Sequence, residues 1–468
     1  MKHWRHKVIE KVEIPKGWEW VKLKDVCIFF QGYGFPKNLQ GMTAGEYPFF
    51  KVGDISKNVQ AGNTYLEFCE NYINEDILKK LKVKASPRNT IVFAKIGEAL
   101  KLNRRALVKQ PSIIDNNAIG LKADDNTCND IFLFYFLKCL KLENYSRATT
   151  VPSVRKSDIE TIEIPLPPLP EQHRIVAEIE KLFSSLDKGI ESLKTAQQQL
   201  KVYRQAVLKW AFEGKLTNEN VKDGELPEGW RWVKLGDVIA NIEAGKSFKC
   251  DERPPKDDEI GIVKVSAVTW GSYNEMESKT CFSNDVINSK YLIKREDFLF
   301  SRANTLELVG ACVIVHKTLK KLMLSDKILR FNFTENASKK YVLHYLRSHK
   351  GRNEIEQKST GNQMSMRNIG QEKIRQIQFP LPLLPEQHSI VSEIESRLSV
   401  CDKLEESITL GLKQAEALRQ SILKKAFEGK LVHQDPNDEP ARVLLECIRA
   451  QKEKNMPEKI SKTKKKKQ

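Results

Sequence analysis

The chain has 468 residues, of which 40% are hydrophobic and 30% are charged, and its formal net charge at pH 7 is +17. This length exceeds that of one ordinary domain, and the composition is globular. No apolar run approaches the roughly 18 to 20 residues that a membrane-spanning helix needs, so we expect a cytoplasmic protein without membrane contact. The nine cysteines are scattered and form no Cys-x-x-Cys pair, which indicates reduced thiols instead of disulfides or a zinc site.

The first globular segment follows a basic N-terminal arm and ends at residue 164. It opens with the Gly-Trp segment IPKGWEWVKLKDV at residues 14–26. Short strands are predicted at 47–55 and 90–97, and an apolar helix at 130–144. Because Trp-x-Trp followed by valine and leucine is typical of one face of a strand, its tryptophans are predicted to pack in the core rather than stack on bases.

Residues 165–216 are predicted to form one long helix, the first rod. Prolines precede it, and Gly214 stands where a helix commonly stops. Its apolar residues recur at alternating steps of four and three, which is the spacing of a coiled-coil seam. The predicted seam consists of Ile175, Ile179, Leu182, Leu186, Gly189, Leu193, Ala196, Leu200, Tyr203, Val207 and Trp210.

The second half of the chain repeats this organisation. After a polar linker at 217–225, the Gly-Trp segment returns as LPEGWRWVKLGDV and matches nine of thirteen positions, including both tryptophans. The second globular segment spans residues 226–379. Its predicted elements are strands at 260–266, 297–302 and 309–315 and a helix at 340–348. Elsewhere the two segments diverge, so we expect one fold that carries two different surfaces.

The second rod, residues 380–431, repeats the first at a constant shift of 215, with 29 of 52 positions identical, and therefore predicts an antiparallel coiled coil of the two. Its seam is less strict and is interrupted at Arg397 and Lys425. The remaining seam residues are Ile390, Ile394, Leu404, Ile408, Ala415, Leu418 and Ile422. The C-terminal segment, residues 432–468, ends in a lysine-rich tail that is predicted to be disordered.

These elements predict an α+β protein with two globular domains of mixed α/β structure, two long helices paired as an antiparallel coiled coil, and a pseudo-two-fold internal repeat. No catalytic residue, cofactor or metal site is predicted. Gly245-Lys246-Ser247 lacks the earlier glycine of a phosphate-binding loop, and no Pro-Pro pair follows the Asn or Asp of an adenine-methylating motif. Excess positive charge lies on the globular segments, whereas the rods are nearly neutral, which favours phosphate contacts by the globular segments.

The paired stretches PLPPLPEQHRIVAEIE and PLPLLPEQHSIVSEIE, with YRQAVLKWAFEGKL and LRQSILKKAFEGKL after them, resemble the specificity subunit of type I restriction-modification systems. The resemblance covers essentially the whole chain. It implies a non-catalytic reader of double-stranded DNA that binds two methyltransferase subunits and, through them, the restriction subunits. Residues 1–164 and 226–379 would be target-recognition domains that each read one half of an asymmetric bipartite site, with the gap set by the rods.

Candidate DNA contacts are polar and basic residues in turn-like runs, since Arg suits guanine and Asn or Gln suits adenine. They are Gln31, Tyr33, Lys37, Arg104, Arg105, Asn116 and Asn117 in the first segment, and Lys246, Arg302, Asn304, Asn362, Gln363 and Arg367 in the second. Candidate partner contacts are two identical triplets at the starts of the rods, for which a structural role at the helix start is the alternative. The triplets are Glu171, Gln172, His173 and Glu386, Gln387, His388.

Two other functions remain open at this point. One is a free-standing restriction or modification enzyme, against which the missing cofactor and metal motifs argue. The other is a coiled-coil scaffold that binds DNA without sequence preference. Selection of one split DNA motif by the chain would distinguish the reader from both.

Overall fold

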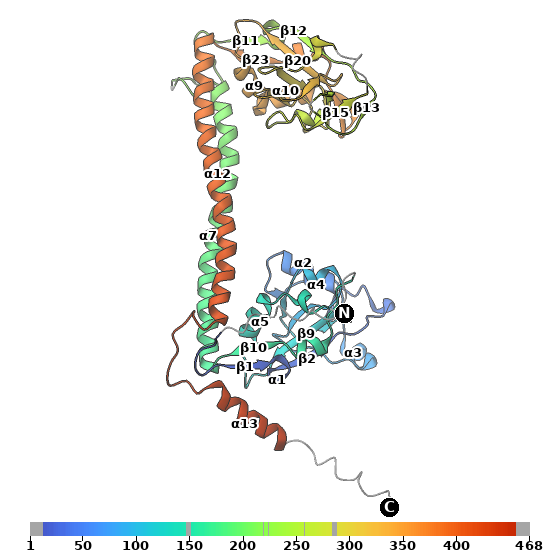
Figure 1. The fold of residues 1–468 in the computed structure, drawn as a ribbon, viewed down its shortest axis with the longest axis vertical. Coiled ribbons are helices and arrows are strands. Elements are labelled where there is room, and N and C mark those ends of the chain that lie inside the picture. Colours follow the sequence, from blue (N-terminus) through green and yellow to red (C-terminus); the bar gives the residue numbers. More distant parts are fainter. Residues whose placement is uncertain are drawn as a thin grey trace, which may run out of the picture. The chain divides into compact units, whose positions relative to one another are not determined.

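The computed structural model describes residues 13–146, 151–218, 220–222, 224–256, 258–282 and 288–454. The basic arm and the lysine-rich tail lie outside these residues. The chain divides into two compact units. Unit 1 comprises residues 1–191 and 412–468, and unit 2 comprises residues 192–411. Each unit holds one globular domain and part of both long helices, α7 (Leu169–Phe212) and α12 (Leu384–Phe427) (Figure 1).

Domain 1, the globular part of unit 1, is a mixed α and β structure. Its elements are β1 (Glu19–Lys22), α1 (Leu23–Val26), β2 (Cys27–Gln31), η1 (Lys37–Leu39), β3 (Tyr47–Phe50), α2 (Val52–Gln60), β4 (Tyr65–Leu66), β5 (Tyr72–Ile73), α3 (Glu75–Leu81), β6 (Ile91–Ala94), α4 (Glu98–Lys101), β7 (Ala106–Val108), β8 (Ile113–Ile114), β9 (Ala118–Ala123), α5 (Asp130–Cys139), η2 (Leu142–Tyr145), α6 (Lys156–Glu160) and β10 (Glu163–Leu166). The sheets have the orders β2-β9-β6-β7-β4, β5-β3-β8 and β1-β10. The apolar helix α5 is buried in the main core, which also includes strand β6 and the start of α7.

Domain 2, the globular part of unit 2, is built similarly. Its elements are β11 (Arg231–Lys234), α8 (Leu235–Val238), β12 (Ile239–Ala244), β13 (Cys250–Asp251), β14 (Ile260–Val263), η3 (Val265–Ala267), β15 (Ser278–Cys281), η5 (Ser289–Tyr291), β16 (Phe298–Ser301), β17 (Ala303–Asn304), β18 (Cys312–Ile314), β19 (Lys321–Met323), β20 (Ile328–Phe333), α9 (Lys339–Arg347), α10 (His349–Lys358), β21 (Thr360–Gln363), β22 (Met366–Asn368), α11 (Gln371–Arg375) and β23 (Gln378–Leu381). The sheets are β12-β20-β16-β18, β13-β15-β14-β19, β17-β22-β21 and β11-β23. Helix α9 packs with β16 and β20 in the main core.

The predicted fold class is confirmed, with differences in individual elements. The strand predicted at 47–55 ends at Phe50, and Ile55 lies in helix α2. The helix predicted at 130–144 ends as α5 at Cys139. Trp18 and Trp230 are buried as predicted and Trp20 is half-buried, but Trp232 is 51% exposed on strand β11, which pairs with β23 in a two-stranded sheet.

The first strand of each domain pairs with the last, which brings the Gly-Trp segment against the residues that precede each rod. Strand β1 is antiparallel to β10, with Trp20 opposite Pro165. Strand β11 is antiparallel to β23, with Trp232 opposite Pro380. In each domain, the repeated motifs therefore join the first strand to the last one, directly before the long helix begins.

One hydrogen bond beside these paired strands differs between the repeats. It predicts that matched substitutions lower the stability of the two units by different amounts. Trp18 Nε1 donates to Glu171 Oε2 at 3.0 Å between buried groups, whereas Trp230 Nε1 has no hydrogen-bond partner among the described residues. Trp18→Phe should therefore destabilise unit 1 by about 1 to 3 kcal/mol beyond the packing loss shared with Trp230→Phe, because a buried carboxylate loses a hydrogen-bond donor.

Urea unfolding of the full chain, followed by hydrogen exchange in α5 for unit 1 and α9 for unit 2, measures both costs. Equal losses in the two variants would contradict the role of the Trp18–Glu171 hydrogen bond.

Helices α7 and α12 pair antiparallel in both units, shown as the green and orange helices of Figure 1. In unit 2, Arg204 Nη2 donates to Asp402 at 2.6 Å and to Glu405 at 3.0 Å. In unit 1, Arg419 donates to Asp187. Arg419 and Asp187 are the counterparts of Arg204 and Asp402 at the shift of 215, so the same interhelical ion pair occurs twice.

The observed seam shares one position of each heptad with the predicted seam, whereas its second position lies one residue later in the sequence. The two helices use equivalent positions at steps of four and three. In α7 these positions are Ile179, Phe183, Leu186, Ile190, Leu193, Gln197, Leu200, Arg204, Val207 and Ala211. In α12 they are Ile394, Leu398, Cys401, Glu405, Ile408, Leu412, Ala415, Arg419, Ile422 and Ala426.

Five of the predicted α7 positions, seven residues apart, are confirmed, but the intervening ones are wrong. Tyr203 and Trp210 are exposed, as are Leu404 and Leu418 in α12. The predicted interruptions at Arg397 and Lys425 also disappear, because the seam passes through the next residue in each case. The error arose because the seam includes Arg204, Arg419 and Glu405, which an apolar pattern does not reveal.

A glycine at the end of each rod packs on the proline of a Gly-Trp segment. Gly214 has φ +77°, and a Cβ there would lie 2.1 Å from Pro227 Cγ. Gly429 has φ +67°, and a Cβ there would lie 2.2 Å from Pro15 Cγ. Only glycine fits such a contact, so each rod ends in the same junction.

The segment after α12 also packs on domain 1. Asp438 accepts from Arg174 Nη2 at 2.6 Å, and Ala441 N donates to Gly17 O at 3.0 Å. Helix α13 (Ala441–Lys454) buries Leu445 in the core of unit 1.

Candidate nucleic-acid interface

In both domains a loop crosses a turn at a distance that only glycine permits. A Cβ on Gly32 would lie 1.7 Å from Asp115 O, and one on Gly245 would lie 1.8 Å from Leu324 O. Hydrogen bonds hold the same crossing, from Tyr33 N to Ile114 O at 2.9 Å in domain 1. In domain 2 the bond runs from Gly245 N to Ser325 O at 3.2 Å. The loops after β2 and β12 are thus fixed at equivalent places.

A third segment joins this crossing directly after a central strand. Lys95 follows β6, and its amide donates to Asn117 O at 2.9 Å. Arg302 follows β16, and its amide donates to Lys327 O at 3.0 Å. The residues after these two cations continue beside a fourth segment, through the bridge of Ile96 with Ser153 and the pairing of β17 with β22.

Four segments therefore meet in each domain, and they are termed the loop edge. The loop edge consists of residues 31–37, 95–97, 115–117 and 151–154 in domain 1, and of residues 245–248, 302–304, 325–327 and 360–369 in domain 2. The backbone framework is shared, whereas the side chains differ.

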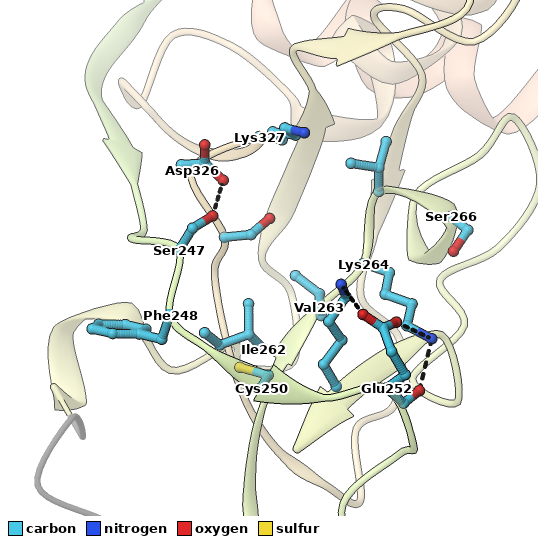
Figure 2. A pocket seen from close by; sticks show the side chains of 13 residues that line it. Ser247, Phe248, Cys250, Glu252, Ile262, Val263, Lys264, Ser266, Asp326 and Lys327 are labelled. Carbon is cyan, nitrogen blue, oxygen red and sulfur yellow. Dashed lines mark hydrogen bonds and ion pairs between the residues drawn. The ribbon is translucent and has the colours of Figure 1, made fainter. Parts of the chain in front are cut away.

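A cavity of about 380 Å³ adjoins the loop edge of domain 2 (Figure 2). Its wall includes Ser247, Phe248, Glu252, Lys264, Ser266, Lys279, Asp326 and Lys327. Figure 2 shows Ser247 facing Asp326, with its hydroxyl donating to the carboxylate, and Glu252 beside Lys264. Lys279 donates to Glu252 at 2.6 Å and holds the pKa of that carboxyl below its usual value. Three lysines against two carboxylates suit a polar, anionic ligand such as a nucleic acid.

Most candidate DNA contacts of domain 1 lie on the loop edge. Gln31, Lys37, Asn116 and Asn117 are exposed there. Tyr33 is half-buried, and its hydroxyl accepts from Lys84 N at 3.2 Å.

The two adjacent arginines of domain 1 lie elsewhere. Arg104 is half-buried beyond helix α4 and outside the loop edge. Arg105 is 2% exposed, its guanidinium lies 4.8 Å from the Phe93 ring centroid and donates to Asn103 Oδ1 at 2.5 Å, and burial lowers its pKa to about 9. Arg105 therefore fills the interior of domain 1 and presents no donor to a ligand.

In domain 2 the structure brings the candidates together around β17-β22-β21. Lys246 and Gln363 are exposed, and Arg302 and Asn304 are half-buried. Arg367 donates to Ser359 O at 2.6 Å and to Gly361 O at 2.9 Å, so its guanidinium holds the hairpin in place. The side chain of Asn362 lies outside the described residues.

The triplets at the rod starts divide into buried and exposed members. Gln172 and Gln387 are 0% exposed, and each makes three hydrogen bonds that tie its rod to its domain. Glu171 is buried too, whereas Glu386 is half-buried. His173 and His388 are exposed and are the members that a partner could reach.

Sequence reasoning missed Lys95, Lys264, Lys279 and Lys327. The shift between equivalent residues falls from 215 in the rods to 207 between Lys95 and Arg302, so a constant-shift alignment does not pair them. The sequence feature that could have identified Lys95 and Arg302 as equivalent is their position directly after a predicted apolar strand.

The fold defines a duplicated protein in which two related domains are built on paired helices. Residues 15–201 and 227–414 both match the family model of the type I restriction modification DNA specificity domain. The specificity subunit of the type I restriction enzyme EcoKI from Escherichia coli strain K12 is 24% identical, over 97% of this chain and 99% of its own length. That of EcoEI, also from E. coli, is 25% identical, over 84% of this chain and 79% of its own length.

Solved structures show the same fold. A chain from a structure on the complex assembly and conformational transition of the type I restriction-modification system has a TM-score of 0.68 at 21% identity, over 90% of this chain and all of that chain. The HsdS subunit of Thermoanaerobacter tengcongensis has a TM-score of 0.58 at 21% identity, over 90% of this chain and 99% of its own. The chain belongs to the type I restriction-modification DNA specificity family, and it is a specificity subunit of such a system.

The described residues include no helix with the length and apolar character that a membrane span requires. Nor do they hold a group of three or more His, Cys, Asp or Glu side chains placed to bind a metal ion.

Proposed function

We propose that each loop edge reads one half of an asymmetric, bipartite DNA site, and that the paired helices set the gap between the halves. The observation that supports this proposal is the shared backbone framework with different side chains. Where domain 1 presents Asn116 and Asn117, domain 2 presents Asp326 and Lys327 at the turn that the glycine loop crosses. Different donors and acceptors on one framework select different bases.

In this proposal residues 1–164 and 226–379 are the two target-recognition domains, and the chain itself catalyses no reaction. It binds two methyltransferase subunits and, through them, the restriction subunits, in the cytoplasm. The exposed His173 and His388 at equivalent helix starts suit contacts to two copies of one partner. The chain thereby directs adenine methylation or restriction to its site.

Exchange of residues 14–164 for the corresponding domain of another family member tests this division. The full-length chain, purified with its methyltransferase subunits, is expected to methylate a split motif, and the exchange should alter one half of that motif and leave the other unchanged. Sequencing of methylated sites from a random duplex library measures both halves.

An exchange that altered both halves together would contradict independent reading. Turnover by the chain alone would favour the free-standing enzyme, and a complex that selects no motif would favour the non-specific scaffold.

A further inference from the structure

Lys95 and Arg302 occupy the same position in the two domains, although the shift of 215 that aligns the rods does not pair them. Each follows the last residue of a central strand, β6 or β16. Each donates its amide to the glycine-crossed turn, and its carbonyl accepts from Val154 N or Ile369 N at 2.9 Å. Val154 and Ile369 are themselves related by the repeat shift of 215, which fixes the equivalence independently.

The backbone at this position is held on both sides, so the side chain starts from a fixed point at the loop edge. A rigid strand end is a more precise base for recognition than a free loop. The two flanking turns carry other candidate contacts, Asn117 in domain 1 and Lys327 in domain 2.

The side chains at this position retain free donors. Arg302 Nε donates to Asn368 Oδ1 at 3.4 Å, and within the described residues its two terminal nitrogens have no hydrogen-bond partner. Among the residues that the structure describes, no carboxylate forms an ion pair with the ammonium of Lys95. Arg367 differs, because backbone carbonyls already occupy its guanidinium.

We infer that Lys95 and Arg302 are equivalent specificity-determining residues, each contacting one guanine in the half-site of its own domain. Arginine and lysine both donate to guanine O6 and N7 in the major groove, which makes guanine the base that this pair of residue types shares. Arg367 is a positioning residue that holds the hairpin beside Arg302. This inference rests on the proposed function, since it requires two half-sites.

The test compares Lys95→Ala and Arg302→Ala in the full chain with its methyltransferase subunits, by methylated-site sequencing and by DNA affinity at several salt concentrations. Each variant should lose roughly 5- to 100-fold of the discrimination at one G·C pair, in the half-site of its own domain only. Arg302→Lys should lose part of that discrimination, because lysine lacks the bidentate fork of arginine.

Lys22→Ala and Lys234→Ala are matched controls. These exposed lysines are equivalent in the Gly-Trp repeats. Lys22 precedes strand β2 and Lys234 precedes strand β12, and the loop edge begins at the opposite end of each strand. We expect their specificity profiles to match that of the unsubstituted complex.

Three outcomes would overturn the inference: profiles of the Lys95 and Arg302 variants like those of the controls, relaxation at an A·T pair or in the other half-site, or uniform weakening with a reduced salt slope, which indicates a phosphate contact. These differ from failure of the proposed function, in which the unsubstituted complex itself selects no split motif.

Discussion

Ile408→Asp is expected to lower the free energy of unfolding of unit 2 by roughly 3 to 5 kcal/mol, the usual cost of an uncompensated buried charge. Ile408 is 7% exposed on the seam of α12. It is the counterpart of Leu193, whose Cδ1 would lie 3.3 Å from a Cβ placed on Gly411 in the same unit. Thermal unfolding followed by circular dichroism measures the loss.

Leu410→Asp is the control for this variant. Leu410 is 54% exposed on the same helix, so its substitution removes an apolar side chain and adds a charge without burying either. We expect a change within about 1 kcal/mol, mainly from helix propensity. Similar losses in the two variants would show that the seam does not pass through Ile408.

Gln387→Ala should cost unit 2 about 3 kcal/mol, because several buried polar groups lose partners that water cannot replace. Gln387 Oε1 accepts from Ser338 N at 2.8 Å, and Nε2 donates to Asn336 O and Pro382 O, both at 2.9 Å. Urea unfolding of the full chain measures the change.

Under the proposed function, substitution of the adjacent residue, His388→Ala, should change partner binding and leave stability unchanged. His388 is exposed, so the variant should unfold like the unsubstituted chain and bind its methyltransferase subunits more weakly. Unchanged stability of Gln387→Ala would contradict the buried role of the glutamine. Undiminished assembly of His388→Ala in a pull-down would contradict the contact role of the histidine.

The repeated sequence predicted the rods and their pairing, because a long helix is recognisable from the period of its apolar residues, its length and its terminal residues. It predicted only half of the seam, since Arg204 and Arg419 occupy seam positions while Tyr203 and Leu418 beside them are exposed. An apolar pattern cannot show that a charged residue packs its stem between helices and pairs at its tip.

The loop edge was less accessible to sequence reasoning. Asn117 and Gln363, which were predicted from turn-like runs, are exposed on the loop edge, but nothing local distinguishes the buried Arg105 from its half-buried neighbour Arg104. The Lys95 and Arg302 equivalence depends on hydrogen bonds between segments that are distant in the chain. Such bonds constrain geometry while leaving the side-chain identities free to change.

The two glycine-proline junctions bear on how the chain is connected. Between α7 and domain 2 the partners Gly214 and Pro227 belong to one continuous stretch of chain. Between α12 and domain 1 the partners Gly429 and Pro15 make the same contact from segments far apart in sequence. The glycine-proline contact therefore forms whether or not the chain is continuous across the junction. A chain opened between Gly214 and Pro227 is accordingly expected to retain the packing of that junction, as the junction of Gly429 with Pro15 does without a direct connection.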